Sequence, residues 1–256
     1  MGSRPGIFVQ QHFNFGPLGP RDWSLDEMRR LFSWLKDLGY DTLAFPLLTV
    51  IREPSGEFNV YEQASLYHSV LGAPGSFAAG SAYGPSDRYL GTPKGLARAE
   101  LLRDQMRLAR QMGFSTSLVL WANIAAPQFA EEHPELAAVA SSDIYLEGTA
   151  LCPSREESLE HLLAFYTEQV RYFDAADGYV LHLRDPGGCT CERCTPQGRM
   201  FEKLIGAYHA MIRSQRPDSD IALYAWHMNL PEVAHLAANL PEDITIFETR
   251  RIHAMD

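Results

Sequence analysis

Two hydrophobic patterns alternate along the chain. Runs of β-branched and aromatic residues, such as Tyr179-Val180-Leu181, are typical of buried strands, whereas apolar residues three and four positions apart indicate helices with one buried face. The strand pattern occurs six times, at 7–15, 42–50, 117–124, 178–183, 221–227 and 244–248. The helical pattern occurs between these runs, at 25–38, 97–112, 154–173, 198–213 and 231–240. The chain is therefore predicted to alternate strand and helix throughout.

The expected helix ends support this alternation. Ser24 and Glu27 form a capping-box pattern, as do Ser154 and Glu157, so each pair predicts a helix start. Leu38-Gly-Tyr-Asp-Thr-Leu and Met112-Gly-Phe-Ser-Thr-Ser-Leu both read as helix, terminating glycine, aromatic residue, polar step and strand. The same junction occurring twice indicates a repeated βα unit.

The predicted strands favour an α/β fold with a parallel sheet, because each is apolar enough to be covered on both faces. No Gly-x-Gly-x-x-Gly follows the first strand, so a dinucleotide-binding unit has no support. Charged, aromatic or amide residues end nearly every strand, which suggests a ring of loops around one pocket, as in a (β/α)8 TIM barrel. The prediction is a single TIM-barrel-like domain over residues 1–256, with a long loop insertion at about 51–95.

The strand count is two short of a complete barrel. About six βα units fit into the 256 residues, so the barrel is expected to be incomplete in this chain or completed elsewhere. The alternative is that segments read as loops, such as 143–146, are strands.

Charge and composition limit the classes of partner that the chain is expected to bind. A net charge of -10 argues against nucleic acid and anionic membranes, which select basic surfaces. There is no apolar run of the roughly 20 residues that cross a bilayer, and the first residues lack the apolar core of a signal peptide. The chain as given is expected to be cytoplasmic, although Met1-Gly2-Ser3 could replace a leader of a secreted protein.

The four cysteines of the chain are Cys152, Cys189, Cys191 and Cys194. The last three form Cys-x-Cys-x-x-Cys on a glycine-rich loop, and Cys152 could complete a tetrahedral zinc site of structural type. The alternatives are a disulfide between two of them or reduced thiols that only pack.

Two carboxylates are candidates for catalysis. Asp185 follows the fourth strand, where partial desolvation could raise its pKa toward that of a proton donor, and Glu248 ends the sixth strand. Together they could flank a glycosidic bond as acid and nucleophile or base. The alternatives are that Asp185 caps the turn that follows it and that Glu248 pairs with Arg250 or Arg251.

Residues suited to sugar binding also gather at the predicted strand ends. Aromatic rings stack on pyranose C–H groups, while amides and imidazoles bind hydroxyls. Trp121, Trp226, Tyr61, Tyr145 and Tyr224 offer such rings. The predicted substrate-binding residues are His12, Asn14, Trp121, Asn123, His182, Arg184, Trp226 and His227.

Two stretches carry a resemblance to known families. With Leu151-Cys-Pro-Ser and, about 30 residues later, His182-Leu-Arg-Asp185 followed by Gly-Gly-Cys-x-Cys-x-x-Cys, the chain resembles bacterial (β/α)8 glycoside-hydrolase-like proteins. These are distantly similar to the hexosaminidases of glycoside hydrolase family 20 and to α-glucuronidases. The hexosaminidase signature ends in Gly-Gly-Asp-Glu after a histidine; His182 and Asp185 match it here, and Pro186 stands in place of the glutamate. The resemblance implies a carbohydrate ligand.

The sequence thus predicts a glycoside hydrolase acting on an oligosaccharide or glycoconjugate. Asp185 would be the acid or base and Glu248 the second carboxylate. One alternative is a barrel that binds carbohydrate without catalysis. The other is a metal-dependent hydrolase or lyase whose ion is shared by His12, His182 and His227.

Overall fold

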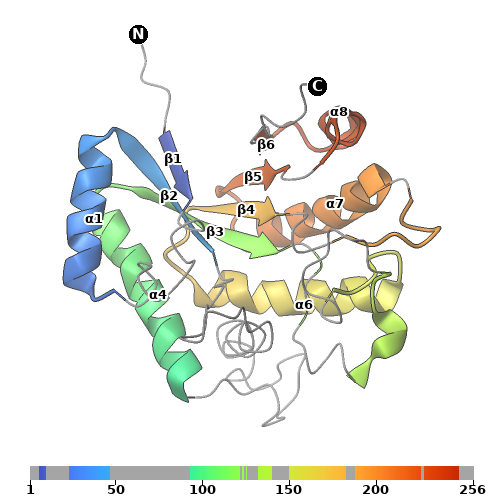
Figure 1. The fold of residues 1–256 in the computed structure, drawn as a ribbon, viewed down its shortest axis with the longest axis horizontal. Coiled ribbons are helices and arrows are strands. Elements are labelled where there is room, and N and C mark those ends of the chain that lie inside the picture. The colour runs from blue at the N-terminus through green and yellow to red at the C-terminus, as the bar shows by residue number, and fades with distance from the viewer. Residues whose placement is uncertain are drawn as a thin grey trace, which may run out of the picture.

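A computed structural model describes residues 6–9, 23–46, 93–121, 123, 125, 132–139, 150–182, 188–195, 197–225 and 228–247. Strands and helices alternate through these residues (Figure 1). The strands are β1 Gly6–Val9, β2 Tyr40–Pro46, β3 Ser115–Trp121, β4 Gly178–His182, β5 Asp220–Tyr224 and β6 Ile244–Phe247. The helices are α1 Leu25–Asp37, α4 Pro93–Gln111, the short 3-10 helix η4 Pro134–Leu136, α6 Glu156–Tyr172, α7 Gln197–Gln215 and α8 Leu230–Asn239.

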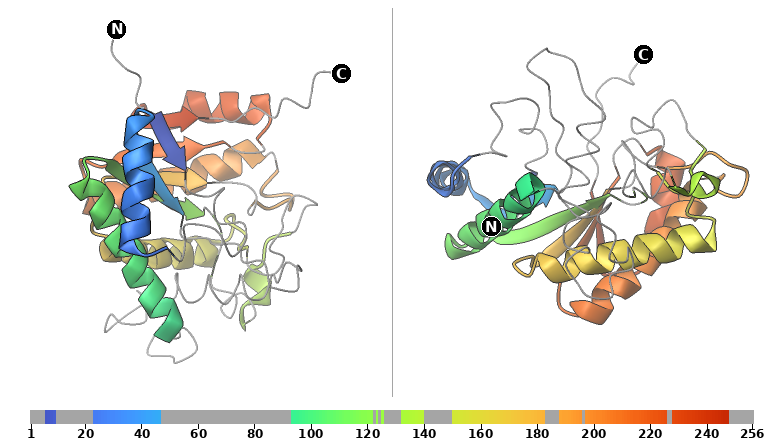
Figure 2. Two further views of the ribbon diagram at one scale, coloured as in Figure 1. Left: turned by 60° about the vertical axis from the view of Figure 1, so that its left-hand side comes forward. Right: turned by 90° about the horizontal axis from the view of Figure 1, so that it is seen from below.

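The six strands form one parallel sheet in the order β1-β2-β3-β4-β5-β6. Every strand therefore pairs with the strand that follows it in the sequence, and the predicted parallel α/β sheet is confirmed. Because each crossover steps in the same direction, the connecting helices gather on one side of the sheet. Buried side chains of α4, α6 and α7 belong to one core cluster with the sheet, and the right-hand view of Figure 2 shows α6 (yellow) beside α7 (orange). An open doubly wound sheet would instead reverse its strand order at a switch point.

The two faces of the sheet are packed differently. Side chains at alternate positions, such as Leu118, Leu120 and Leu181, point to the helices and belong to the main hydrophobic core. The intervening positions form a smaller cluster of Ala44, Val119, Val180 and Tyr224. This second face thus combines small residues with the large rings of Tyr224 and Phe247.

The first helix is capped as the sequence predicts. The Ser24 hydroxyl accepts from the backbone N–H of Glu27 at 3.4 Å, and the Glu27 carboxylate accepts from the backbone N–H of Ser24 at 2.8 Å. Gly39 and Gly113, which end α1 and α4, have φ values of 87° and 81°. Both glycines adopt the left-handed conformation that terminates a helix, so the repeated βα junction is confirmed.

The second predicted capping box, at Ser154 and Glu157 before α6, is wrong. α6 begins at Glu156 with Arg155 as N-cap, and no side chain caps it. The Ser154 hydroxyl lies 3.0 Å from the sulfur of Cys152 instead. The sequence pattern failed because the helix begins one residue later than the pattern predicts, so that Arg155 and not Ser154 occupies the N-cap position. The opposite error occurs at α8, where Asn229 and Glu232 form a capping box that the sequence reading missed.

Some predicted features lie outside the described residues. The insertion at 51–95 does so except for its last three residues, which belong to α4, and segment 143–146 does so entirely. Helix α4 begins four residues before the predicted Ala97, with Pro93 at its first position, where proline is favoured. None of the described helices combines the length and apolarity needed to cross a membrane.

Candidate functional site

The carboxyl ends of four adjacent strands carry ring-bearing residues in one row. Trp121 pairs with His182, His182 with Tyr224, and Tyr224 with Phe247 across β3 to β6. Tyr224 and Phe247 belong to the cluster on the face away from the helices. In parallel α/β folds, active sites form at the carboxyl ends of the strands, because the loops after the strands converge there.

The rings of His182, Tyr224 and Phe247 in this row contact one another. His182 packs edge-on against Tyr224 with 4.9 Å between ring centroids, and Tyr224 stacks on Phe247 at 5.0 Å. His182 and Tyr224 are buried, at 1% and 5% exposure. The three residues form a continuous row of contacting rings, the aromatic wall, at the carboxyl end of the sheet.

Most of the predicted catalytic and substrate-binding residues lie outside the described residues. This holds for both predicted catalytic carboxylates, Asp185 and Glu248, which therefore stay predictions. It also holds for His12, Asn14, Arg184, Trp226 and His227 among the predicted substrate-binding residues, and for Tyr61 and Tyr145. Along the chain, Asp185 follows His182 by three residues and Glu248 directly follows Phe247. The two carboxylates are thus tied in sequence to the two ends of the aromatic wall.

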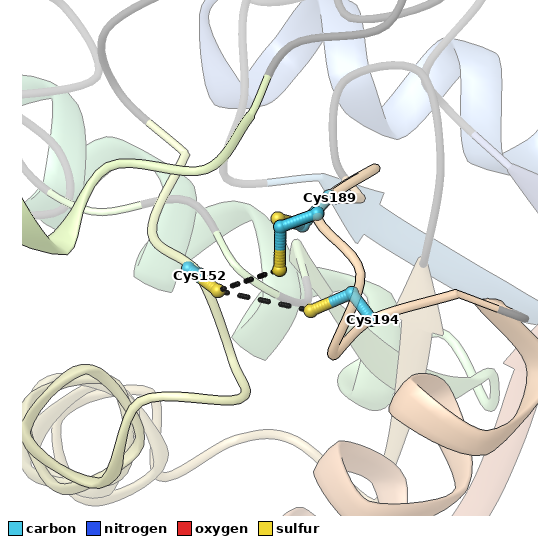
Figure 3. Close-up of side chains that lie close together, drawn as sticks. Cys152, Cys189 and Cys194 are labelled. Atoms are coloured by element: carbon cyan, nitrogen blue, oxygen red, sulfur yellow. Dashed lines mark hydrogen bonds between the residues drawn. The ribbon is translucent and has the colours of Figure 1, made fainter.

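The four cysteines come together, and Figure 3 shows Cys152, Cys189 and Cys194 pointing toward one another. Their sulfur atoms all lie within 4.8 Å of one another, and the sulfur of Cys152 is 3.7 Å from those of Cys191 and Cys194. A disulfide would need about 2.05 Å between two sulfurs, and all four thiols are free here. Cys191 is partly exposed and the other three are buried. This cluster could hold a metal ion.

Backbone hydrogen bonds fix the cysteine-bearing segments. The Cys152 N–H donates to the Leu136 carbonyl at 2.8 Å, next to η4. The Val139 N–H donates to the Cys189 sulfur at 3.3 Å, and the Thr190 N–H returns to the Val139 carbonyl at 3.1 Å. Residues 136–139 therefore connect the turn before α6 to the loop after β4. They bond the backbone of Cys152 on one side, and the thiol of Cys189 and the backbone of Thr190 on the other.

Asn123, just beyond β3, ties the same two segments together. Its side-chain amide N–H group donates to the carbonyls of Leu151 at 2.8 Å and Gly188 at 3.0 Å, and its side-chain oxygen accepts from the Gly188 N–H at 2.8 Å. Asn123 is fully buried. The amide thus positions the residues directly preceding Cys152 and Cys189. Its predicted contact with substrate stays a prediction.

The close thiols shift one another's pKa values in opposite directions. The pKa of Cys152 is lowered, because hydrogen bonds from Cys189 and Cys194, and then from Ser154, stabilise its thiolate. The pKa of Cys194 is raised, mainly because its proton is held by Cys152. One thiolate shared among several thiols is a starting state for a ligand set that loses its protons to a metal.

A cavity of about 270 Å³ adjoins the cluster. It is lined by Ala137, Val139, Cys152, Arg155, Cys191, Glu192 and Arg193. Two arginines and one glutamate therefore line the cavity together with the partly exposed Cys191.

Comparison with known proteins places the fold. No family model matches the chain, and no curated protein matches it either. Among solved structures, the catalytic modules of glycoside hydrolase family 20 in the pneumococcal exo-β-D-N-acetylglucosaminidase StrH match 95% of this chain with 10% identity and a TM-score of 0.52. A Flavobacterium johnsoniae chitobiase matches 97% of it with 10% identity and a TM-score of 0.53, and an Anoxybacillus α-amylase 91% with 10% identity and 0.52.

The chain spans 58% of the StrH module, 34% of the chitobiase and 50% of the amylase. At this level of identity the similarity shows the fold alone: the chain is folded like part of a TIM barrel. The resemblance to hexosaminidases expected from the sequence is thus supported at the level of architecture.

Proposed function

We propose that this chain supplies six βα units of a (β/α)8 barrel that binds a carbohydrate and hydrolyses a glycosidic bond. The row of ring-bearing residues at the carboxyl ends of β3 to β6 carries the proposal, because it places aromatic residues together at the edge of the sheet where the active sites of such folds form. The sequential strand order supports barrel closure, since all crossovers step the same way. The similarity of the fold to glycoside hydrolases supports the proposed barrel and motivates the proposed activity.

In the proposed reaction, Asp185 protonates the glycosidic oxygen and Glu248 acts on the opposite side of the sugar as nucleophile or base. The aromatic wall of His182, Tyr224 and Phe247 would border the sugar ring between them. The other predicted substrate-binding residues would bind its hydroxyls. The four cysteines take no chemical step, because a closed ligand set leaves no position for substrate.

The test is hydrolysis of a panel of chromogenic glycosides, starting with N-acetyl-β-glucosaminides and α-glucosides because of the structural neighbours. Asp185→Asn should lower kcat by about 100-fold to 10,000-fold, the usual contribution of a general acid. Asp218→Asn is the matched control, since Asp218 is exposed in the turn before β5, at the amino end of the sheet. Unchanged turnover in Asp185→Asn would reject its assignment.

Carbohydrate binding without catalysis gives a different result. Calorimetric titration with the same sugars would then show binding but no released product. Asp185→Asn would leave the turnover at zero, as in the unaltered chain. This outcome would retain the carbohydrate-binding barrel and reject the hydrolase.

A further inference from the structure

The arrangement of the four cysteine sulfurs matches the dimensions of one metal ion. With a Zn–S bond of about 2.3 Å, the sulfurs of a tetrahedral four-thiolate site lie about 3.8 Å apart. The Cys152 sulfur lies 3.7 Å from those of Cys191 and Cys194, and no pair exceeds 4.8 Å. We propose that Cys152, Cys189, Cys191 and Cys194 bind one Zn²⁺ ion, which joins the turn before α6 to the loop after β4.

The chemistry of the ligands favours zinc over the other occupants of thiolate sites. Four thiolates with no oxygen ligand select zinc, copper(I) or iron among biological metals. A tetrahedral four-sulfur arrangement is the structural zinc geometry, whereas iron–sulfur clusters place inorganic sulfides between the metals and so spread the cysteines apart. A single disulfide would use two sulfurs and leave the other two thiols unpaired, at least one of them buried.

Hydrogen-bond donors lie beside the proposed site, and two arginines and one glutamate line the adjoining cavity. Four thiolates around Zn²⁺ carry a net charge of about -2, which must be offset by donors and cations. The Val139 N–H points to the Cys189 sulfur at 3.3 Å, and the Ser154 hydroxyl lies 3.0 Å from the Cys152 sulfur. Arg155 and Arg193 line the adjoining cavity together with Cys152 and Cys191.

The proposed site is structural. Its four positions are filled by cysteines, and three of the four are buried. Asn123 already ties the two cysteine-bearing segments through Leu151 and Gly188, so the ion would bind to a largely preformed frame. Zinc would thus hold in place the loop after β4, which leads on from the strand ending at His182.

The first experiment measures metal in the full purified chain. We expect about one zinc ion per chain by mass spectrometry of metals. Titration with a mercurial thiol reagent should release this zinc as the four thiols react. After removal of zinc under reducing conditions, added Co²⁺ should give the intense visible bands of tetrahedral cobalt thiolate. These readouts need no glycosidase assay, so they stand independently of the proposed function.

Variants test the ligands one by one. Cys152→Ser should lose the bound zinc and lower the Tm by about 10 °C, because the metal contributes directly to folding. Ser154→Ala, which removes a neighbour of the Cys152 sulfur, should weaken zinc affinity by about 10-fold to 100-fold. Ser214→Ala is the matched control: Ser214 is exposed on α7, bonds only the carbonyl of Met211 in the described contacts, and should leave zinc affinity unchanged.

Three results would overturn the proposal. The first is iron with visible absorption in the purified chain. The second is a chain with no metal that takes up neither Zn²⁺ nor Co²⁺ after reduction. The third is full zinc content in the serine variants of all four cysteines, which would place the ion elsewhere.

Discussion

Gly178, the first residue of β4, occupies a position where the neighbouring strands leave no room for a side chain. A Cβ atom there would lie 2.9 Å from the carbonyl oxygen of Asp220 and 3.1 Å from the hydroxyl oxygen of Ser117. The first of these atoms is backbone, fixed by the pairing of β4 with β5. We therefore expect Gly178→Ala to destabilise the protein by about 1 to 3 kcal/mol, the usual cost of overpacking.

A second glycine provides the control for this prediction. Gly206 lies inside α7, and a Cβ atom there would have no neighbour within 4 Å. Gly206→Ala should stabilise the protein by about 0.5 to 1 kcal/mol, because alanine loses less entropy in a helix. Urea unfolding of both variants measures the two free energies. If both changes have the same sign, the close approach at Gly178 does not govern its stability.

Single residues also show why sequence patterns succeed or fail. Ser24 caps α1 because Glu27 is the partner within its reach. Ser154 has the same pattern in sequence, but α6 begins one residue later with Arg155 as its N-cap, and the Ser154 hydroxyl contacts the Cys152 sulfur. The predicted convergence of the four cysteines is confirmed. It could be predicted because one short motif holds three of them. The role of Asn123 in joining two loops depends on contacts 28 and 65 residues away, which no local pattern reveals.

At the scale of elements, a charged cluster fixes the turn before β6 to α7. Asp243 accepts hydrogen bonds from His209 at 3.0 Å and from Arg213 at 2.6 Å. These bonds, first that of His209 and then that of Arg213, lower the pKa of Asp243 to about 2. Helix α7 thereby holds the start of the last strand in register with β5.

The lowered pKa predicts a dependence of stability on pH. In the unfolded chain the carboxyl group titrates near 3.9. Because the folded pKa is lower, the contribution of Asp243 is fully present above about pH 4 and is lost as the pH falls toward 2. Its side chain is 48% exposed, so solvent screening limits the effect to about 1 kcal/mol or less.

Urea unfolding of Asp243→Asn and of the unaltered chain tests this dependence. The variant should be less stable at about pH 6, and the difference should shrink toward about pH 2. Asp218→Asn, at an exposed turn residue, is the control for removing one acidic charge. A difference between Asp243→Asn and the unaltered chain that stays constant over this range would contradict the assigned role.

At the scale of the whole molecule, the alternation of strand and helix could be predicted because each element carries its own periodicity. The order of the strands could not be predicted from this periodicity, since the hydrophobic pattern of a parallel strand is the same in an open sheet and in a barrel. The prediction of a barrel depended instead on the polar and aromatic residues at the strand ends. The observed order β1 to β6 shows that each strand pairs with the strands that precede and follow it in the sequence. The row from Trp121 to Phe247 likewise depends on register, which is set by pairing between distant segments.

Hydrogen exchange tests this sheet as a whole. In a parallel sheet the N–H groups of a strand point alternately to its two neighbours, so a central strand is bonded on both sides. Among the described strands, β3 and β4 have two partners each, whereas β1 and β6 have one. We expect amides of β3 and β4 to exchange slowest in the 256-residue chain, and β1 and β6 to exchange faster. Peptide-level mass spectrometry measures these rates. Equal protection of β6 and β4 would contradict the expectation, and would show that the outer side of β6 is paired as barrel closure requires.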